Sequence, residues 1–117
     1  MSIKKIIILI LILVSTNSFG MFVFHTAYWS GCVQGKVNEL GMSKSKHSDL
    51  CKSMAEKQTF KKIPYNKENE IIEESTVYYF KGCSSNIEND SLCHDLTKKY
   101  HKDMTEIFNS VKDKYEK

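Results

Sequence analysis

The stretch LCHDLTKKYHKDMTEIFNSVKDKY, residues 92–115, has an apolar side chain at every third or fourth position. This spacing is typical of an amphipathic helix, because residues three and four apart share one helix face. The apolar stripe consists of Leu92, Leu96, Tyr100, Met104, Ile107, Phe108, Val111 and Tyr115. Asn89, Asp90 or Ser91 can cap the start of this helix. We expect the stripe to organise the core by itself.

A second helix is expected upstream, beginning near Asn66, just after Pro64, which is the single proline of the chain. Glu68 and Glu70 then fall in its first turn, where carboxylates interact favourably with the helix dipole. One face of this helix carries residues at helical spacing, namely Ile72, Ser75, Tyr79 and Cys83. The polar residues 84–86 suit its end.

Two more helices are expected in the first half of the chain. The first carries a stripe made of Phe22, Thr26, Trp29, Val33, Val37 and Leu40. It ends at Gly41, a residue type that is common just after helix C-termini. After a polar loop over residues 43–47, Ser48 or Asp49 caps a shorter helix that runs through Phe60. Residues 61–65 link the two halves, and the fold class is all-α with four helices.

The chain contains an imperfect internal repeat. The sequence YWSGC at residues 28–32 resembles YFKGC at residues 79–83. Each is followed by a polar stretch and then by a Leu-Cys pair, at residues 50–51 and 92–93. The repeat predicts two helical hairpins, over residues 21–62 and 66–117, that together form one small domain.

The four cysteines of this small chain are interpreted first as a disulfide framework. Three pairings are possible, and the repeat favours Cys32 with Cys51 and Cys83 with Cys93. Each hairpin would then be clipped by its own disulfide. Cysteine and histidine spacings typical of zinc or of thiol redox centres are missing from the sequence. We therefore expect no metal and no cofactor.

Residues 1–20 have the pattern of a signal peptide. Lys4 and Lys5 precede an apolar run over residues 6–14, and small residues at Ser18 and Gly20 fit a signal-peptidase site. The alternative is an uncleaved membrane anchor, because the chain carries no acidic or basic residue other than His25 from residue 6 to 29. Both interpretations export the remaining domain. A cleaved signal peptide releases it into the periplasm or outside the cell, and an uncleaved segment anchors it at the inner membrane.

The charge pattern argues against nucleic acid as a partner. All 17 basic residues are lysines, and, less Lys4 and Lys5, they nearly balance the 14 acidic residues. Arginine, which makes bidentate contacts to phosphates and bases, does not occur in the sequence.

The sequence shows no catalytic constellation, so we expect a protein that is not an enzyme. His94 and His101 flank the stripe of residues 92–115. Two interpretations of them stay open, a shared ligand or solvated side chains without a role. A small metal-binding or hydrolytic protein that uses the histidines is the least favoured function class.

The aromatic residues near the start of the domain indicate a binding surface. Phe22, Phe24, Tyr28 and Trp29 cannot all face one small core. We expect at least one of Phe24 and Tyr28 to be exposed and to bind a partner, since aromatic residues are favoured as interface anchors. The leading hypothesis is an exported protein that binds another protein, as an inhibitor, immunity protein or envelope adaptor. The alternative is a membrane-active or lipid-binding helical module.

Overall fold

The computed structural model describes residues 21–41 and 44–115, so the predicted signal segment, residues 1–20, lies outside the described residues. The described chain forms helices and no strands, which confirms the all-α prediction. The four helices are α2 (Met21–Leu40), α3 (Lys44–Glu56), α4 (Glu68–Ser84) and α5 (Asp90–Tyr115). Within these residues, no helix is both long and apolar enough to span a bilayer.

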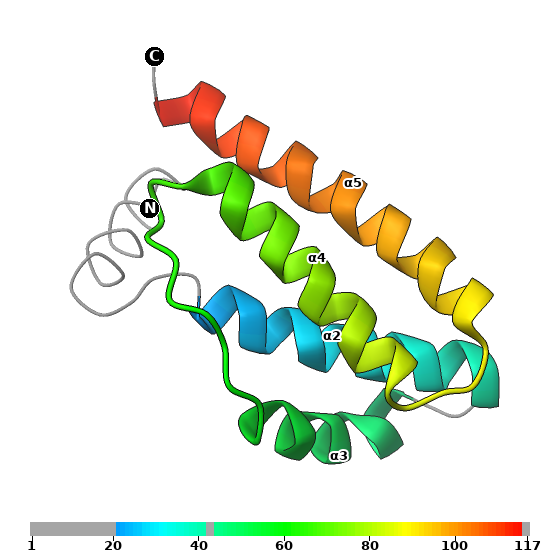
Figure 1. Ribbon diagram of the computed structural model, residues 1–117. Coiled ribbons are helices and arrows are strands. Elements are labelled where there is room, and N and C mark those ends of the chain that lie inside the picture. Colours follow the sequence, from blue (N-terminus) through cyan, green and yellow to red (C-terminus); the bar gives the residue numbers. More distant parts are fainter. Residues whose placement is uncertain (1–20, 42–43, 116–117) are drawn as a thin grey trace.

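The helices pack in two pairs around a central crossing. In Figure 1, α4 crosses α2 and runs beside α5, while α3 lies along α2 away from α5. The most extensive contact between two helices is that of α2 with α4. Helices α4 and α5 are antiparallel, because Phe80 lies against His94 whereas Glu73, about two turns earlier on α4, lies against His101.

Two helix ends follow the predicted capping residues, Asn89 before α5 and Gly41 after α2. The side-chain oxygen of Asn89 accepts a hydrogen bond of 3.1 Å from the backbone N–H of Leu92 at the start of α5. Gly41 ends α2 with a φ of 66°, a conformation that glycine adopts without steric cost. The expected loop over residues 43–47 is wrong, because α3 begins at Lys44 and ends at Glu56, four residues before Phe60.

The core lies between α2 and α4. Its buried residues are Phe24, Ala27, Tyr28, Ala55, Ile63, Ile71, Tyr78 and Tyr79. The prediction that α5 organises the core by itself is wrong. Leu96, Tyr100 and Phe108 are only partly buried against this cluster, and Ile107 is 55% exposed. On α5, Cys93 is the residue that becomes fully buried. In contrast, the predicted inner face of α4 is confirmed, since all four of its residues are buried.

The predicted apolar stripe of α2 is wrong at three of its positions. Phe22 is 75% exposed, Leu40 is 54% exposed, and Thr26 also faces solvent. The buried face instead contains Phe24, Ala27, Tyr28, Gly31 and Gly35. Successive residues are rotated by about 100° around the helix axis. Phe22 and Phe24 are therefore about 200° apart around α2, and their side chains cannot both point inward.

Two glycines set the distance between α2 and α4. A β-carbon at Gly31 would overlap the backbone carbonyl of Tyr79, and one at Gly82 would overlap the backbone carbonyl of Tyr28. These contacts are reciprocal, because Tyr28 and Gly31 occupy the same places in the first repeat as Tyr79 and Gly82 in the second. The internal repeat therefore corresponds to a contact in which each copy of the motif packs against the other.

Candidate functional site

The four cysteines form the two disulfides that the repeat predicted. Cys32 is bonded to Cys51 and Cys83 to Cys93, each with a Cα–Cα distance of 5.7 Å. The first disulfide joins α2 to α3 and the second joins α4 to α5. Such bonds indicate that the chain folds in an oxidising environment. All four cysteines are fully buried, so the disulfides are structural and a thiol in solution has no access to them.

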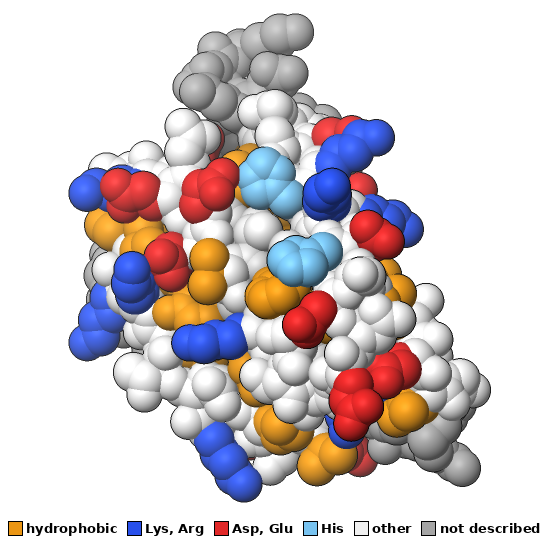
Figure 2. All heavy atoms as spheres, turned by 45° about the vertical axis from the view of Figure 1, so that its right-hand side comes forward, with side chains coloured by type: hydrophobic (Ala, Val, Ile, Leu, Met, Phe, Trp, Pro, Cys, Tyr) orange, Lys and Arg blue, Asp and Glu red, His pale blue; other side chains and the backbone are white. Residues whose placement is uncertain are grey.

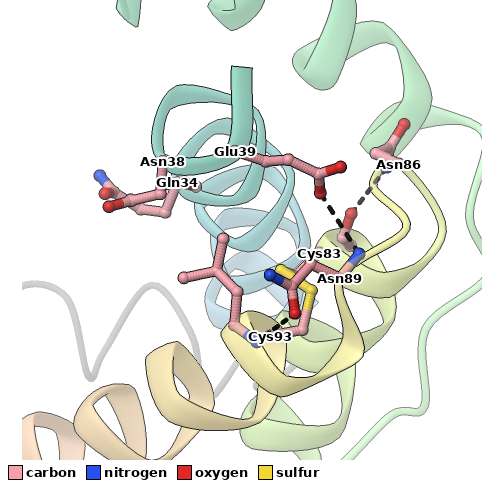
Figure 3. Close-up of a disulfide and its surroundings, with 9 residues drawn as sticks. Gln34, Asn38, Glu39, Cys83, Asn86, Asn89 and Cys93 are labelled. Atoms are coloured by element: carbon pink, nitrogen blue, oxygen red, sulfur yellow. Dashed lines mark hydrogen bonds between the residues drawn. A yellow bond between two sulfur atoms is a disulfide. The ribbon is translucent and has the colours of Figure 1, made fainter. Parts of the chain in front are cut away.

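Figure 3 shows that the second disulfide lies beneath a polar corner, where the end of α2 meets the connection between α4 and α5. The backbone N–H of Asn89 donates to Oε2 of Glu39, at 3.4 Å, across this corner. The side-chain amide of Asn86 donates to the carbonyl of Gly82. The polar groups named here thus bond to one another within the corner. The corner is a structural feature that fixes the start of α5.

The expectation that Phe24 or Tyr28 is exposed is wrong. Phe24 is 0% and Tyr28 is 2% exposed. The ring of Phe24 packs on Tyr78 with 5.1 Å between ring centroids, and the backbone of Tyr28 lies against Gly82. Neither side chain can contact a partner in this fold, and both belong to the core between α2 and α4.

The polar side chains that could contact a ligand lie instead between α4 and α5. A hollow of about 280 Å³ is lined there by Thr76, His94, Thr97, Lys98 and His101. We call these five residues the histidine hollow. The face in Figure 2 carries two histidine side chains close together, with carboxylates, lysines and apolar side chains around them.

Each histidine of the hollow contacts a residue of α4. Nε2 of His101 lies 3.0 Å from Oε1 of Glu73, within hydrogen-bonding distance. The ring of His94 packs on Phe80, with 4.7 Å between ring centroids. Glu73 and Phe80 lie about two turns apart on one face of α4, and Val77 lies between them with 53% of its surface exposed. The two imidazoles are thus held at the two ends of a partly apolar face.

The hydroxyl of Thr97 differs from those of neighbouring threonines. Thr76 and Thr105 each donate to the backbone carbonyl four residues earlier, at 2.7 and 2.8 Å. The Oγ1 atom of Thr97 is buried and has no hydrogen-bond partner among the described residues. A buried hydroxyl without a partner is destabilising, and such groups in native proteins call for an explanation.

The positive charge of the hollow comes from Lys98, which is exposed. Among the described side chains, ion pairs join Lys61 to Glu74 and His101 to Glu73, and Lys98 belongs to neither. The carboxylate of Glu73 on α4 contacts His101 of the hollow. Lys98 therefore has no carboxylate partner among the side chains that the structure describes.

Two further hollows have a different character. One, of about 430 Å³, is lined by Lys61, Ile63, Asn69, Glu70, Glu73 and Glu74. Its lysine is paired with Glu74 at 3.1 Å, and this contact raises the pKa of Lys61. The other, of about 250 Å³, is lined by Gln34, Tyr79, Leu96, Lys99, Tyr100 and Asp103.

The third hollow is floored by stacked tyrosines. The rings of Tyr79 and Tyr100 lie 4.4 Å apart and nearly parallel. Burial, with Tyr100 and Asp103 nearby, raises the pKa of Tyr79 to about 12. Burial also raises the pKa of Tyr100, against the opposite effect of a hydrogen bond to Ser75. These phenols stay neutral at physiological pH and contribute to packing.

The sequence contained part of the signal for the histidine hollow. His94 and His101 are about two turns apart on one helix, so their common face was predictable. The contributions of Thr97, Lys98 and α4 were missed, because they depend on how α4 and α5 align. In the described part of the chain, His, Cys, Asp and Glu side chains form no group of three or more that could hold a metal ion.

Comparison with known proteins adds no assignment. No protein-family model matches the chain, and neither a curated protein nor a solved structure matches it. The histidine hollow and its surroundings are therefore the features from which a function is inferred.

Proposed function

We propose that this chain is an exported, non-enzymatic protein that binds another protein, as an inhibitor, an immunity protein or an envelope adaptor. In this proposal residues 1–20 are a cleaved signal peptide and the domain acts in the periplasm or outside the cell. The two buried disulfides support export, because such bonds persist in oxidising compartments.

The observation that carries the proposal is the combination of side chains on the face of α4 and α5. Exposed Val77 and half-buried Phe80 supply apolar area, and the histidine hollow beside them supplies donors for hydrogen bonds. Protein interfaces combine an apolar centre that includes aromatic residues with a polar rim. This face has both parts within about two turns of each helix.

The arrangement of the polar groups supports binding over catalysis. Thr97 and His101 are one turn apart, and His101 contacts Glu73, which resembles the order of a nucleophile, a base and a carboxylate. However, the hydroxyl of Thr97 makes no hydrogen bond to His101. An activated nucleophile needs this hydrogen bond to its base.

A membrane-active or lipid-binding module is the second candidate. The observation that favours it is Phe22, which is 75% exposed at the start of α2, directly after residues 1–20. An exposed aromatic residue next to an uncleaved anchor would lie at the membrane surface. In this alternative Phe22→Ser would release the protein from phosphatidylglycerol vesicles, whereas a protein-binding domain would not sediment with them.

Site-specific photocrosslinking tests the proposal. The photoreactive residue p-benzoylphenylalanine replaces Val77 in the full-length protein, expressed in its native host. The matched control carries it in place of Leu50 on α3, which is 51% exposed against 53% for Val77. We expect one discrete protein adduct from position 77 and none from position 50. The same adducts from both positions, or none from position 77, would contradict a binding role for this face.

A further inference from the structure

We propose that this chain pairs with a second copy of itself by exchanging helical hairpins, so that α2 and α3 of one molecule pack on α4 and α5 of the other. The surface involved is the contact between α2 and α4, which is the most extensive helix contact of the molecule. A second copy fits this surface because it carries the same two hairpins. The contact itself stays the same in the dimer, and it then joins two chains.

The residues before Thr59 are bonded to the first hairpin. The backbone N–H of Gln58 donates to the carbonyl of Ala55 at 3.1 Å, and its side-chain amide donates to the carbonyl of Met54 at 3.3 Å. Both acceptors belong to α3. Gln58 therefore moves with α3.

The residues after Thr59 are held by the second hairpin. The ring of Phe60 packs on Tyr78 of α4 with 4.9 Å between ring centroids, closer than the 6.3 Å to His25 of α2. The backbone N–H of Lys61 donates to the hydroxyl of Tyr78 at 3.0 Å, and its ammonium group lies 3.1 Å from Glu74. The chain would thus open at Thr59, an exposed residue between these two sets of contacts.

The two hairpins are joined mainly by packing. Between their described residues the structure shows one hydrogen bond, 3.4 Å long, from the backbone N–H of Asn89 to Oε2 of Glu39. The contact otherwise consists mainly of apolar side chains, including Phe24 on Tyr78, and of backbone that approaches at glycines. Each hairpin contains its own disulfide and so stays clipped when the chain opens at Thr59. Packing of this kind can form between two molecules as it forms within one.

Protein concentration decides which form is populated, because both forms contain the same contacts. Within one molecule, the short connection gives each hairpin an effective concentration in the mM range at the other. We therefore expect monomer and dimer to be balanced at roughly 1 mM protein, and monomer to dominate far below it.

Refolding at two concentrations tests the exchange. The purified protein, with both disulfides formed, is refolded from urea at about 1 mM and at about 10 μM, and size-exclusion chromatography with light scattering separates monomer from dimer. We expect about half of the chains in dimers at the higher concentration and almost none at the lower. In a dimer of ¹³C-labelled and unlabelled chains, isotope-filtered NMR should show a contact between the rings of Phe24 and Tyr78 that joins two chains.

Two variants at one position test where the chain opens. Thr59→Pro stiffens the connection and restricts Gln58 to extended backbone, so it should raise the dimer fraction at about 0.1 mM by roughly threefold. Thr59→Gly is the matched control, which keeps the connection flexible and should not raise the dimer fraction. A protein that stays monomeric at both concentrations, a dimer without the contact of Phe24 with Tyr78 between chains, or equal dimer fractions in the two variants would overturn the inference.

Discussion

Nε2 of His101 on α5 and Oε1 of Glu73 on α4 lie 3.0 Å apart, although 28 residues separate them in the chain. This hydrogen bond closes one end of the histidine hollow. Both side chains are substantially exposed, at 43% and 72%, so water competes with the contact. Exposed pairs of this kind contribute about 1 kcal/mol or less to stability. The contact therefore positions the imidazole more than it holds the fold.

Replacing His101 with Gln tests this assignment. We expect His101→Gln to change the free energy of unfolding by less than about 1 kcal/mol, since glutamine can still donate to Glu73. Urea unfolding followed by circular dichroism measures the change. A loss of more than about 2 kcal/mol would show that the contact is a main support of the α4–α5 packing.

Removing the hydroxyl of Thr97 should stabilise the protein. Thr97→Val keeps the shape and removes a buried group that lacks a partner, so we expect a gain of about 1 kcal/mol in the free energy of unfolding. Thr76→Val is the matched control, because it removes a hydroxyl that is bonded to the carbonyl of Ile72. The control should be neutral or destabilised. Equal effects of the two variants in thermal unfolding would argue against an unsatisfied Thr97.

Adding a methyl group between α2 and α4 should be costly. We expect Gly31→Ala and Gly82→Ala each to destabilise the fold by about 3 kcal/mol, because the new β-carbon meets backbone that cannot rotate away. Gly41→Ala serves as the control, since it has open space around it and pays only for its positive φ, about 1 kcal/mol. A smaller loss at Gly31 than at Gly41 would contradict the close approach of the two helices.

Alkaline pH should unfold the protein through its buried phenols. The pKa of Tyr79 is raised from 10.0 to about 12, so the folded state holds this proton more tightly than the unfolded state. The stability linked to this proton is fully present below pH 10 and is lost as the pH rises towards 12. We expect the free energy of unfolding to fall over this range, and to fall less steeply in Tyr79→Phe. Urea unfolding at several pH values, with tyrosinate absorbance, measures both.

The sequence predicted the helices and the disulfides because their signals are local. The stripe of α5 and the matched Gly-Cys and Leu-Cys pairs needed no knowledge of the packing. The buried face of α2 could not be predicted from apolar spacing, because Gly31 and Gly35 carry no apolar side chain and yet decide which face meets α4. Both Phe22 and Phe24 were candidates for the core. The apolar periodicity favoured Phe22, which is exposed, over Phe24, which is buried. The histidine hollow depends on how α4 aligns with α5. This alignment cannot be predicted from a local sequence pattern.

The reciprocal contacts of Gly31 with Tyr79 and of Gly82 with Tyr28 give the molecule the character of a two-fold dimer fused into one chain. Each disulfide lies within one half, so no covalent cross-link opposes separation of the halves. Residues 57–67 alone connect them along the backbone. If that connection swings open, the same interface can close between two molecules, with both disulfides intact. Domain swapping of this protein therefore requires no reduction of either disulfide.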